Sequence, residues 1–162
     1  MALSSFYTSD SIRRKDRIMD AGRTIHLIKT GEYGILSTVS SDGQPYGIPL
    51  SYVVHEDVIY IHCALEGEKI ECIRHENRVT FTIVGKTQVI ETEFATRYES
   101  VILKGQVYFV ENEEEKMQAL MLLSRKYCLS AIDKAPAYIQ KSLSRTCILK
   151  IVIEKITGKE RR

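Results

Sequence analysis

The sequence predicts a β-rich α+β domain: an antiparallel sheet of six strands, closed into a small barrel, with flanking helices. Three observations indicate this fold class. Several segments alternate apolar and polar residues, which is the period of a half-buried strand. The early strands follow one another through tight turns, which favours antiparallel pairing over a parallel sheet with crossover helices. With 162 residues the chain has the length of one domain that can bury its own core.

The N-terminal part predicts an arm followed by a helix. The N-terminal "MALSSFYTSD" has no apolar core of signal-peptide length, and residues 1–15 are expected to form an N-terminal arm of the single domain 1–162. A helix is expected over 20–30, because Asp20 is a good N-cap and Gly31 a good C-terminal stop.

The next part of the chain has period two and predicts three consecutive strands. The turns between them are "SSDGQP", built on Asp42-Gly43, and "HED". Pro49 lies inside the second strand, so an edge, a bulge or a bend is expected there. The third strand is apolar on both faces, which predicts that a helix or a second subunit covers its outer side. The strands are expected over 33–39, 46–54 and 58–64.

The second half mixes strands with the best-formed helix. Asn112 is the expected N-cap of that helix, whose first turn is acidic and whose last turn is basic, matching the helix dipole. Gly105 predicts a kink in the strand before it. Strands are expected over 78–84, 98–111 and 146–156, helices over 67–75, 113–127 and 135–141, a polar excursion over 85–97 and a C-terminal tail over 157–162.

Composition excludes several classes of protein. The formal net charge is only +2, which argues against a nucleic-acid protein that binds through a basic face. No apolar run approaches the roughly 20 residues of a membrane span. Four cysteines without a paired framework fit a reducing compartment. We therefore expect a cytoplasmic protein with neither a nucleic acid nor a membrane as partner.

One stretch, "IHCALEGEKIECIRHE" (61–76), concentrates the chemically active residues. His62, Cys63, Cys72 and His75 superficially offer four zinc ligands. His62 and Cys63 are neighbours on a strand, however, so their side chains point to opposite faces. Cys72 and His75 then supply only two ligands, and we predict no metal site.

The same stretch also permits an anion site at the joint between strand and helix. The first amides of a helix have no internal partner and carry the positive end of its dipole. Gly67 allows close approach of the backbone, Lys69 adds a charge, and His62 is a further donor. A purely structural connection explains the same residues, and the residues alone leave both interpretations open.

The order of several motifs resembles a known family. The segments "GILSTVSSDGQPYGIPLSYVV", "VIYIHCALEGEKIECIRHENRVTFTIV" and "RYESVILKGQVYFVENEEEKMQALMLLSRKY" resemble the pyridoxamine-phosphate-oxidase-like flavin-binding family. The similarity is greatest to its nitroimidazole-resistance (Nim) subgroup and covers about residues 13–156. It implies a split β-barrel and a homodimer with FMN at the subunit interface.

The resemblance also implies site residues. Lys69, the amides near Gly67 and the His62 side chain would hold the FMN phosphate, and residues 48–52 would run beside the isoalloxazine ring. Tyr98 and Ser100 would contact the flavin or line the dimer face. The expected cofactor-binding residues are Ile48, Pro49, Leu50, Ser51, Tyr52, His62, Cys63, Ala64, Gly67, Lys69, Tyr98 and Ser100.

Two departures from the family pattern bear on the substrate and the phosphate site. Glu68 stands where many relatives carry Arg beside the phosphate-binding Lys. The ending "EKITGKERR" does not match that of the true pyridoxamine oxidases, which argues against the vitamin as substrate.

These observations lead to a ranked set of functions. The first is an FMN-dependent oxidoreductase of a small acceptor, such as a nitroaromatic, with a nicotinamide nucleotide as electron donor. The catalytic residue is unknown, and His62 is the one weak candidate. The alternative is a non-catalytic module that binds FMN, deazaflavin or haem. A third hypothesis, an interaction domain held by zinc, requires the metal site that the strand geometry disfavours.

Overall fold

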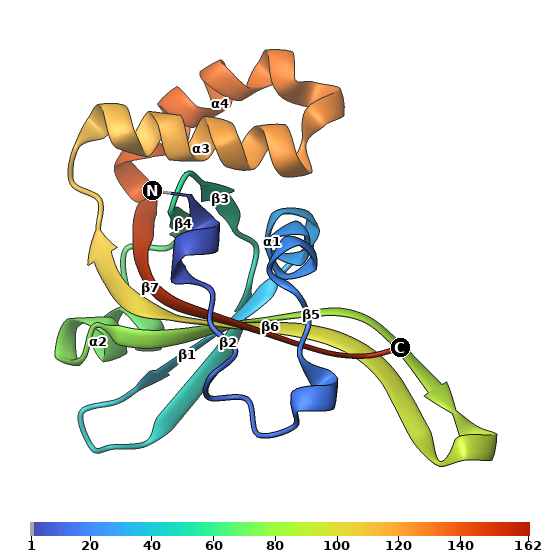
Figure 1. Cartoon of the computed structure of the whole chain (residues 1–162). Helices are drawn as coiled ribbons and strands as arrows, with labels where there is room; N and C mark the ends of the chain where they lie inside the picture. The colour runs from blue at the N-terminus through green and yellow to red at the C-terminus, as the bar shows by residue number, and fades with distance from the viewer. Residues whose placement is uncertain (1) are drawn as a thin grey trace.

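The computed structural model describes residues 2–162, which form one antiparallel sheet and four α-helices (Figure 1). The strands are β1 (Gly34–Val39), β2 (Pro45–Leu50), β3 (Val53–His55), β4 (Val58–Cys63), β5 (Arg78–Ile90), β6 (Ala95–Phe109) and β7 (Cys147–Arg161). The α-helices are α1 (Ala21–Thr30), α2 (Glu68–His75), α3 (Glu113–Tyr127) and α4 (Ala135–Ser142). Short 3₁₀ turns include η1 (Leu3–Phe6) and η3 (Glu91–Glu93).

The sheet order is β2-β1-β5-β6-β7-β4-β3. Its two edge strands, β2 and β3, are consecutive in the chain and are separated only by Ser51 and Tyr52. The sheet therefore curls so that its edges meet through one bent stretch, which is the split-barrel architecture predicted. Counting the two halves of that stretch separately gives seven strands, whereas the sequence predicted six. Pro49 lies on the edge strand β2, as its missing N–H predicts.

The expected polar excursion over 85–97 is wrong. After a shift in register between Val84 and Thr87, β5 and β6 continue to pair as far as Ile90 and Ala95. Figure 1 shows the resulting arm, which projects beyond the rest of the fold with η3 at its tip. The prediction was wrong because it took the polar composition of residues 85–97 as a sign of irregular structure. A strand pair that projects from the barrel faces little core and needs few apolar residues.

The expected C-terminal tail over 157–162 is also wrong. Strand β7 continues to Arg161 and pairs with the outer half of β6, from Thr157 opposite Ile102 to Arg161 opposite Tyr98. The basic ending is thus part of the sheet. Met1 of the expected N-terminal arm lies outside the described residues, and the rest of that arm packs on the barrel through buried Leu3 and Ile12.

Gly105 marks a bulge between β6 and β7. The pairing shifts there, from Lys104 opposite Lys155 to Gly105 opposite Ile153. A Cβ atom on Gly105 would lie 2.1 Å from the carbonyl oxygen of Val152. The predicted kink is confirmed, and glycine is required because two backbones approach each other closely.

Strand β4 separates two apolar clusters. Ile59 and Ile61 face the barrel interior and are fully buried, together with Phe81 and Leu103. Val58 and Tyr60 face outward and pack with residues of α3 and α4. The predicted covering helix is confirmed. No second subunit is needed to bury Ile59 or Ile61, so these two residues are not an argument for a dimer.

The helices begin where their caps predict. The Asp20 side chain accepts a hydrogen bond from the Arg23 amide at the start of α1, and Asn112 accepts one from the Glu115 amide at the start of α3. Within residues 2–162, none of the helices combines the length and the apolar character needed to cross a bilayer.

Candidate functional site

A cavity of about 660 Å³ lies where the C-terminal end of β4 meets α3 and α4. In Figure 1 these two helices lie side by side at one end of the barrel, next to β3 and β4. The volume is within the range of small-molecule and cofactor sites. Its lining residues are Ser51, His62, Cys63, Ala64, Leu120, Leu123, Ser124, Tyr127, Cys128, Ala131, Lys134, Ala135, Tyr138, Ile139, Ser142, Arg145 and Thr146.

The cavity has an apolar wall and a cationic rim. Leu120, Leu123 and Ile139 supply the wall, because α3 and α4 turn their apolar stripes toward β4. Lys134 and Arg145 carry the charges, and none of the described lining residues is a carboxylate. Such a site suits a mostly apolar molecule that carries negative charge.

His62 is the only imidazole in the described wall of the cavity. Its side chain is solvent-accessible, yet the surrounding protein removes part of its hydration and lowers its pKa. The neutral imidazole therefore predominates at pH 7. In that form it has one donor and one acceptor for a bound molecule.

The start of α2, a few residues after His62, has the backbone arrangement of an anion-binding site. Gly67, the N-cap, has φ of 120°, and a Cβ there would meet open space. The amides of Ile70 and Glu71 bond to the Gly67 carbonyl, so those of Glu68 and Lys69 precede the first intrahelical bonds. Glu68 and Glu71 stand in the same turn and reduce its positive potential.

The structure brings only some of the predicted residues together. Ser51, His62, Cys63 and Ala64 line the cavity, whereas Gly67 and Lys69 lie beyond its described wall at the start of α2. In β2, Ile48 and Leu50 pack against the barrel core and Pro49 is exposed.

Tyr52 does not offer free groups to a ligand. Its ring is fully buried, and its hydroxyl donates to the Ile28 carbonyl at 2.7 Å. Its amide donates to the Tyr127 hydroxyl at 2.9 Å, and its carbonyl accepts from Lys126 Nζ at 2.9 Å. The backbone groups of Tyr52 therefore already have protein partners in this structure, and the contact of Tyr52 with a flavin stays a prediction.

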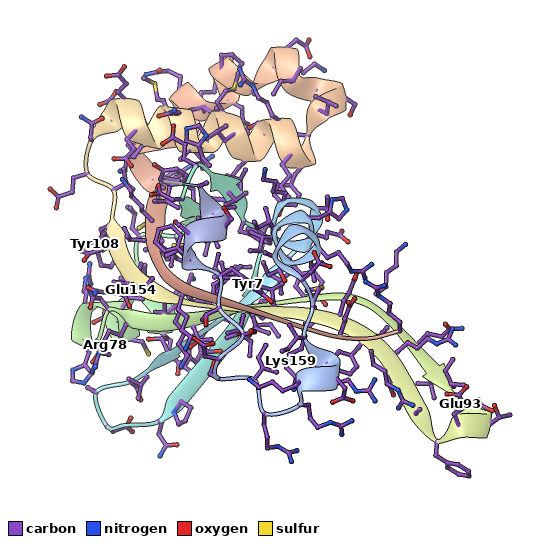
Figure 2. The ribbon with its side chains drawn as sticks, viewed as in Figure 1. Tyr7, Arg78, Glu93, Tyr108, Glu154 and Lys159 are labelled. Atoms are coloured by element: carbon purple, nitrogen blue, oxygen red, sulfur yellow. The ribbon has the colours of Figure 1, made fainter. Side chains whose placement is uncertain are left out.

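Tyr98 and Ser100 lie elsewhere, on the part of β6 that enters the arm. Their partners on β7 are Arg161 and Lys159. Figure 2 labels Lys159, which lies on the far side of the barrel from α3 and α4. Tyr98 lines a separate basic cavity of about 480 Å³, formed by Arg23, Lys86, Thr87, Gln88, Arg97, Glu99, Glu160, Arg161 and Arg162.

The zinc interpretation has no geometric support in residues 2–162. No three His, Cys, Asp or Glu side chains of that range are grouped as metal ligands. Cys72 is buried on the inner face of α2, and His62 faces the cavity on another element.

The sequence did not identify the contribution of α3 and α4 to the cavity. Leu120, Leu123, Ser124 and Tyr127 recur at helical spacing, which was visible as a stripe on one face. The stripe alone does not say which element it covers. No pattern in the sequence indicated that Arg145 and Thr146, next to the start of β7, would line a cavity.

Comparison with solved structures gives three informative similarities. A protein from Bacteroides thetaiotaomicron, provisionally described as a 5-nitroimidazole antibiotic resistance protein, is 26% identical, with a TM-score of 0.73, over 89% of this chain and 86% of that one. An FAD-binding protein from Mesorhizobium loti is 23% identical, with a TM-score of 0.65, over 90% and 98% of the two chains. The haem storage protein HutZ from Vibrio cholerae is 13% identical, with a TM-score of 0.66, over 85% and 93%.

The last two similarities show the fold alone, because their identities are low. A search of curated proteins found no match. The model of the family described as pyridoxamine 5'-phosphate oxidase matches residues 20–160, which include strands β1 to β6, all but the last residue of β7, and the cavity described above. The chain therefore belongs to the pyridoxamine 5'-phosphate oxidase-like split-barrel family.

Proposed function

We propose that the protein is an FMN-dependent oxidoreductase that reduces a small acceptor, with nitroaromatic compounds as the first class to test. The observation that carries the proposal is the cavity at the end of β4. It is apolar, it has cationic residues on its rim, and it is lined by His62, Cys63 and Ala64. The family resemblance implies flavin contacts at the same three residues.

The chemical types of the residues at this site suit the parts of FMN. The amides of Glu68 and Lys69, with the Lys69 ammonium, suit the phosphate, although Glu68 and Glu71 make the site less cationic than a strong phosphate site. Leu120, Leu123 and Ile139 suit an aromatic ring and exclude water. When bound, a flavin supplies hydride transfer to and from the substrate. His62 would then donate a hydrogen bond to the phosphate or the acceptor.

The proposal includes a homodimer with the flavin at the interface. The expected contact residues fall into two groups, one around the cavity and one at Tyr98 and Ser100 on the arm. One subunit does not bring these groups together. A second copy whose arm reaches the cavity of the first would complete the site.

The proposed electron donor is a nicotinamide nucleotide, and neither nucleic acid nor membrane is a proposed partner. The cytoplasm is the proposed compartment, because the four cysteines of the sequence have no paired framework.

The first experiment is the absorption spectrum of the purified protein. Oxidised flavin gives the yellow spectrum, and anaerobic addition of NADH or NADPH should bleach it. Reoxidation by a nitroaromatic compound, with its consumption measured, would support the oxidoreductase. A yellow protein that no donor bleaches contradicts turnover while leaving flavin binding intact.

The phosphate contact is tested by Lys69→Ala. A charge-assisted bond to a phosphate contributes about 1.5 to 3 kcal/mol, so FMN should bind roughly ten- to a hundredfold more weakly. Riboflavin, which lacks the phosphate, should bind the wild type and the variant nearly equally. Both ligands are titrated by flavin fluorescence.

Lys29→Ala is the matched control, because Lys29 is an exposed lysine in the last turn of α1. It should leave both affinities unchanged. If Lys69→Ala weakens riboflavin as much as FMN, or weakens neither, Lys69 does not hold the phosphate.

A second function is favoured by His62. A neutral imidazole in an apolar cavity is also a typical haem ligand, and a haem storage protein shares the fold. The alternative is a module that binds haem, FMN or deazaflavin without turnover. A red-brown protein whose haem spectrum is lost in His62→Ala would favour haem, and a yellow protein would exclude it.

A further inference from the structure

Two of the four cysteines face each other across neighbouring strands. Cys63 ends β4 and Cys147 begins β7, and the two are direct partners in the antiparallel ladder. Opposed residues in such a ladder have Cα atoms about 4.5 or 5.5 Å apart, depending on the type of pair. Both separations fall within the range of about 4.4–6.8 Å that a disulfide requires. The separation of the two Cα atoms is therefore compatible with a disulfide.

The side chains are also in contact. Directly opposed residues point to the same face of a sheet, and Cys63 packs against the core cluster that contains Cys147. Cys147 is buried in the barrel core, whereas Cys63 is half-buried and lines the cavity. A small molecule that enters the cavity can thus reach the pair through Cys63.

The electrostatic environment distinguishes the two sulfurs. Interaction with the Cys63 thiol lowers the pKa of Cys147, and the nearby charges of Lys116, Arg74 and Lys69 act in the same direction. Interaction with Cys147 and burial raise the pKa of Cys63. Cys147 is accordingly the more acidic of the two thiols. The pair thus has an attacking thiol and a resolving thiol.

We propose that Cys63 and Cys147 form a redox-active pair, oxidised to a reversible intramolecular disulfide by hydroperoxides. The Cys147 thiolate attacks the hydroxyl oxygen of the peroxide and the O–O bond breaks, so that Cys147 becomes a sulfenic acid. The leaving group is hydroxide from hydrogen peroxide or an alkoxide from an organic hydroperoxide. The Cys63 sulfur then attacks the Cys147 sulfur, the S–O bond breaks, and the S–S bond forms. The Cys63 proton leaves with the hydroxyl group as water.

In the overall reaction one peroxide gains two electrons, and the two thiols together lose two electrons. An external dithiol reverses the reaction by exchange. The inference stands on the strand pairing and does not depend on which cofactor occupies the cavity.

The test treats the reduced full-length protein with one equivalent of hydrogen peroxide and then blocks free thiols with an alkylating agent under denaturing conditions. Two of the four thiols should become unreactive, and the intact mass should fall by about 2 Da. Peptide mapping should find Cys63 joined to Cys147, and dithiothreitol should restore both thiols.

Cys72 and Cys128 provide the matched control. Cys72 is buried in α2 and Cys128 is exposed after α3, and neither has a cysteine opposite it in the sheet. The double variant Cys72→Ser, Cys128→Ser should form the disulfide as the wild type does.

The single variants test the assigned roles. Cys63→Ser should stop at a sulfenic acid on Cys147, which dimedone traps, and Cys147→Ser should lose that adduct. A disulfide that involves Cys72 or Cys128, or sulfinic acids without any disulfide, would overturn the proposal. So would a dimedone adduct on Cys63 in the Cys147→Ser variant that forms as fast as the adduct on Cys147 in the Cys63→Ser variant.

Discussion

Lys126 is a half-buried charged residue of α3 that contacts both Gly31 and Tyr52. Its Nζ donates to the carbonyls of Gly31 at 2.7 Å and Tyr52 at 2.9 Å, and lies 3.8 Å from the centre of the Tyr52 ring. Burial lowers the pKa of Lys126 to about 8, because the charged form loses hydration. The carbonyls and the ring face oppose that shift, since both stabilise a cation.

The lowered pKa of Lys126 makes the free energy of unfolding depend on pH. Below about pH 8 Lys126 is protonated in both the folded and the unfolded chain, so the cost of burying its charge is present in full. Between about pH 8 and 10.5 the unfolded chain holds a proton that the folded chain has released. The free energy of unfolding therefore rises with pH across this interval.

Comparison with Lys126→Met isolates this effect from other titrating groups. The stability of the wild type relative to the variant should increase by about 1 kcal/mol from pH 7.5 to 10, a value discounted for partial exposure. Urea denaturation at both pH values measures it. A flat or falling difference would mean that the carbonyls and the Tyr52 ring outweigh the loss of hydration.

At the scale of single residues, the sequence located those whose neighbours are close in the chain. His62 and Cys63 end β4 and Ala64 follows them, and their place in a cavity follows from that position. The Tyr52 contacts to Lys126 and Tyr127 join residues 74 and 75 positions apart, and no local pattern indicates them. The same holds for the pairing of Cys63 with Cys147, since β4 and β7 are distant in sequence.

At the scale of elements, the bulge at Gly105 is the most demanding feature of the sheet. In Gly105→Ala the new methyl group meets the Val152 carbonyl oxygen, and neither backbone can move without breaking the ladder. We expect a loss of about 2–4 kcal/mol in the free energy of unfolding.

Gly47→Ala is the control, because a Cβ at Gly47 in β2 would lie 3.7 Å from Ile35, an ordinary contact. It should change stability by less than about 1 kcal/mol. Both variants are compared with the wild type by chemical denaturation. Equal effects of the two substitutions would refute the role assigned to the close approach at Gly105.

Elements with caps, stops or a buried face were predicted well. Helices α1 and α3 begin at Asp20 and Asn112, and β5 buries the alternating residues Val79, Phe81 and Ile83. The arm and the end of β7 were missed, because they are polar strands stabilised by pairing with each other rather than by a core. Hydrophobic periodicity detects alternating apolar side chains, whereas the arm is mostly exposed and the buried residues at the end of β7 are Gly158 and Glu160.

At the scale of the whole molecule, the barrel closes because one stretch of chain forms both edges of the sheet. The sequence predicted an antiparallel barrel but not that β2 and β3 would lie at opposite edges. The bend at Ser51 and Tyr52 is set by tertiary contacts, chiefly the buried Tyr52 ring against Phe81. Closure of this kind is a property of the packed barrel and has no local signature.

The arm is the part of the molecule that one subunit leaves without a packing partner. Near its tip Val89 is 69% exposed and Phe94 is 99% exposed, and Phe94 has the left-handed φ of 47° that non-glycine residues adopt only rarely. Figure 1 shows the hairpin extending away from the barrel, and Figure 2 labels Glu93 at its end. An apolar tip on a projecting hairpin is expected to be covered in an assembly.

We therefore expect the arm to hold the proposed homodimer together. In the double variant Val89→Ser, Phe94→Ser the apolar contact is lost while the ladder of β5 and β6 is kept, so the protein should dissociate to a folded monomer. Light scattering at micromolar concentration measures the mass, and circular dichroism verifies the fold.

Leu129→Ser is the control, because Leu129 is equally exposed at 69% but follows α3, away from the arm. It should leave the dimer intact. A wild type that is monomeric with flavin bound would contradict the dimer itself, whereas a double variant that stays dimeric would place the interface on another face.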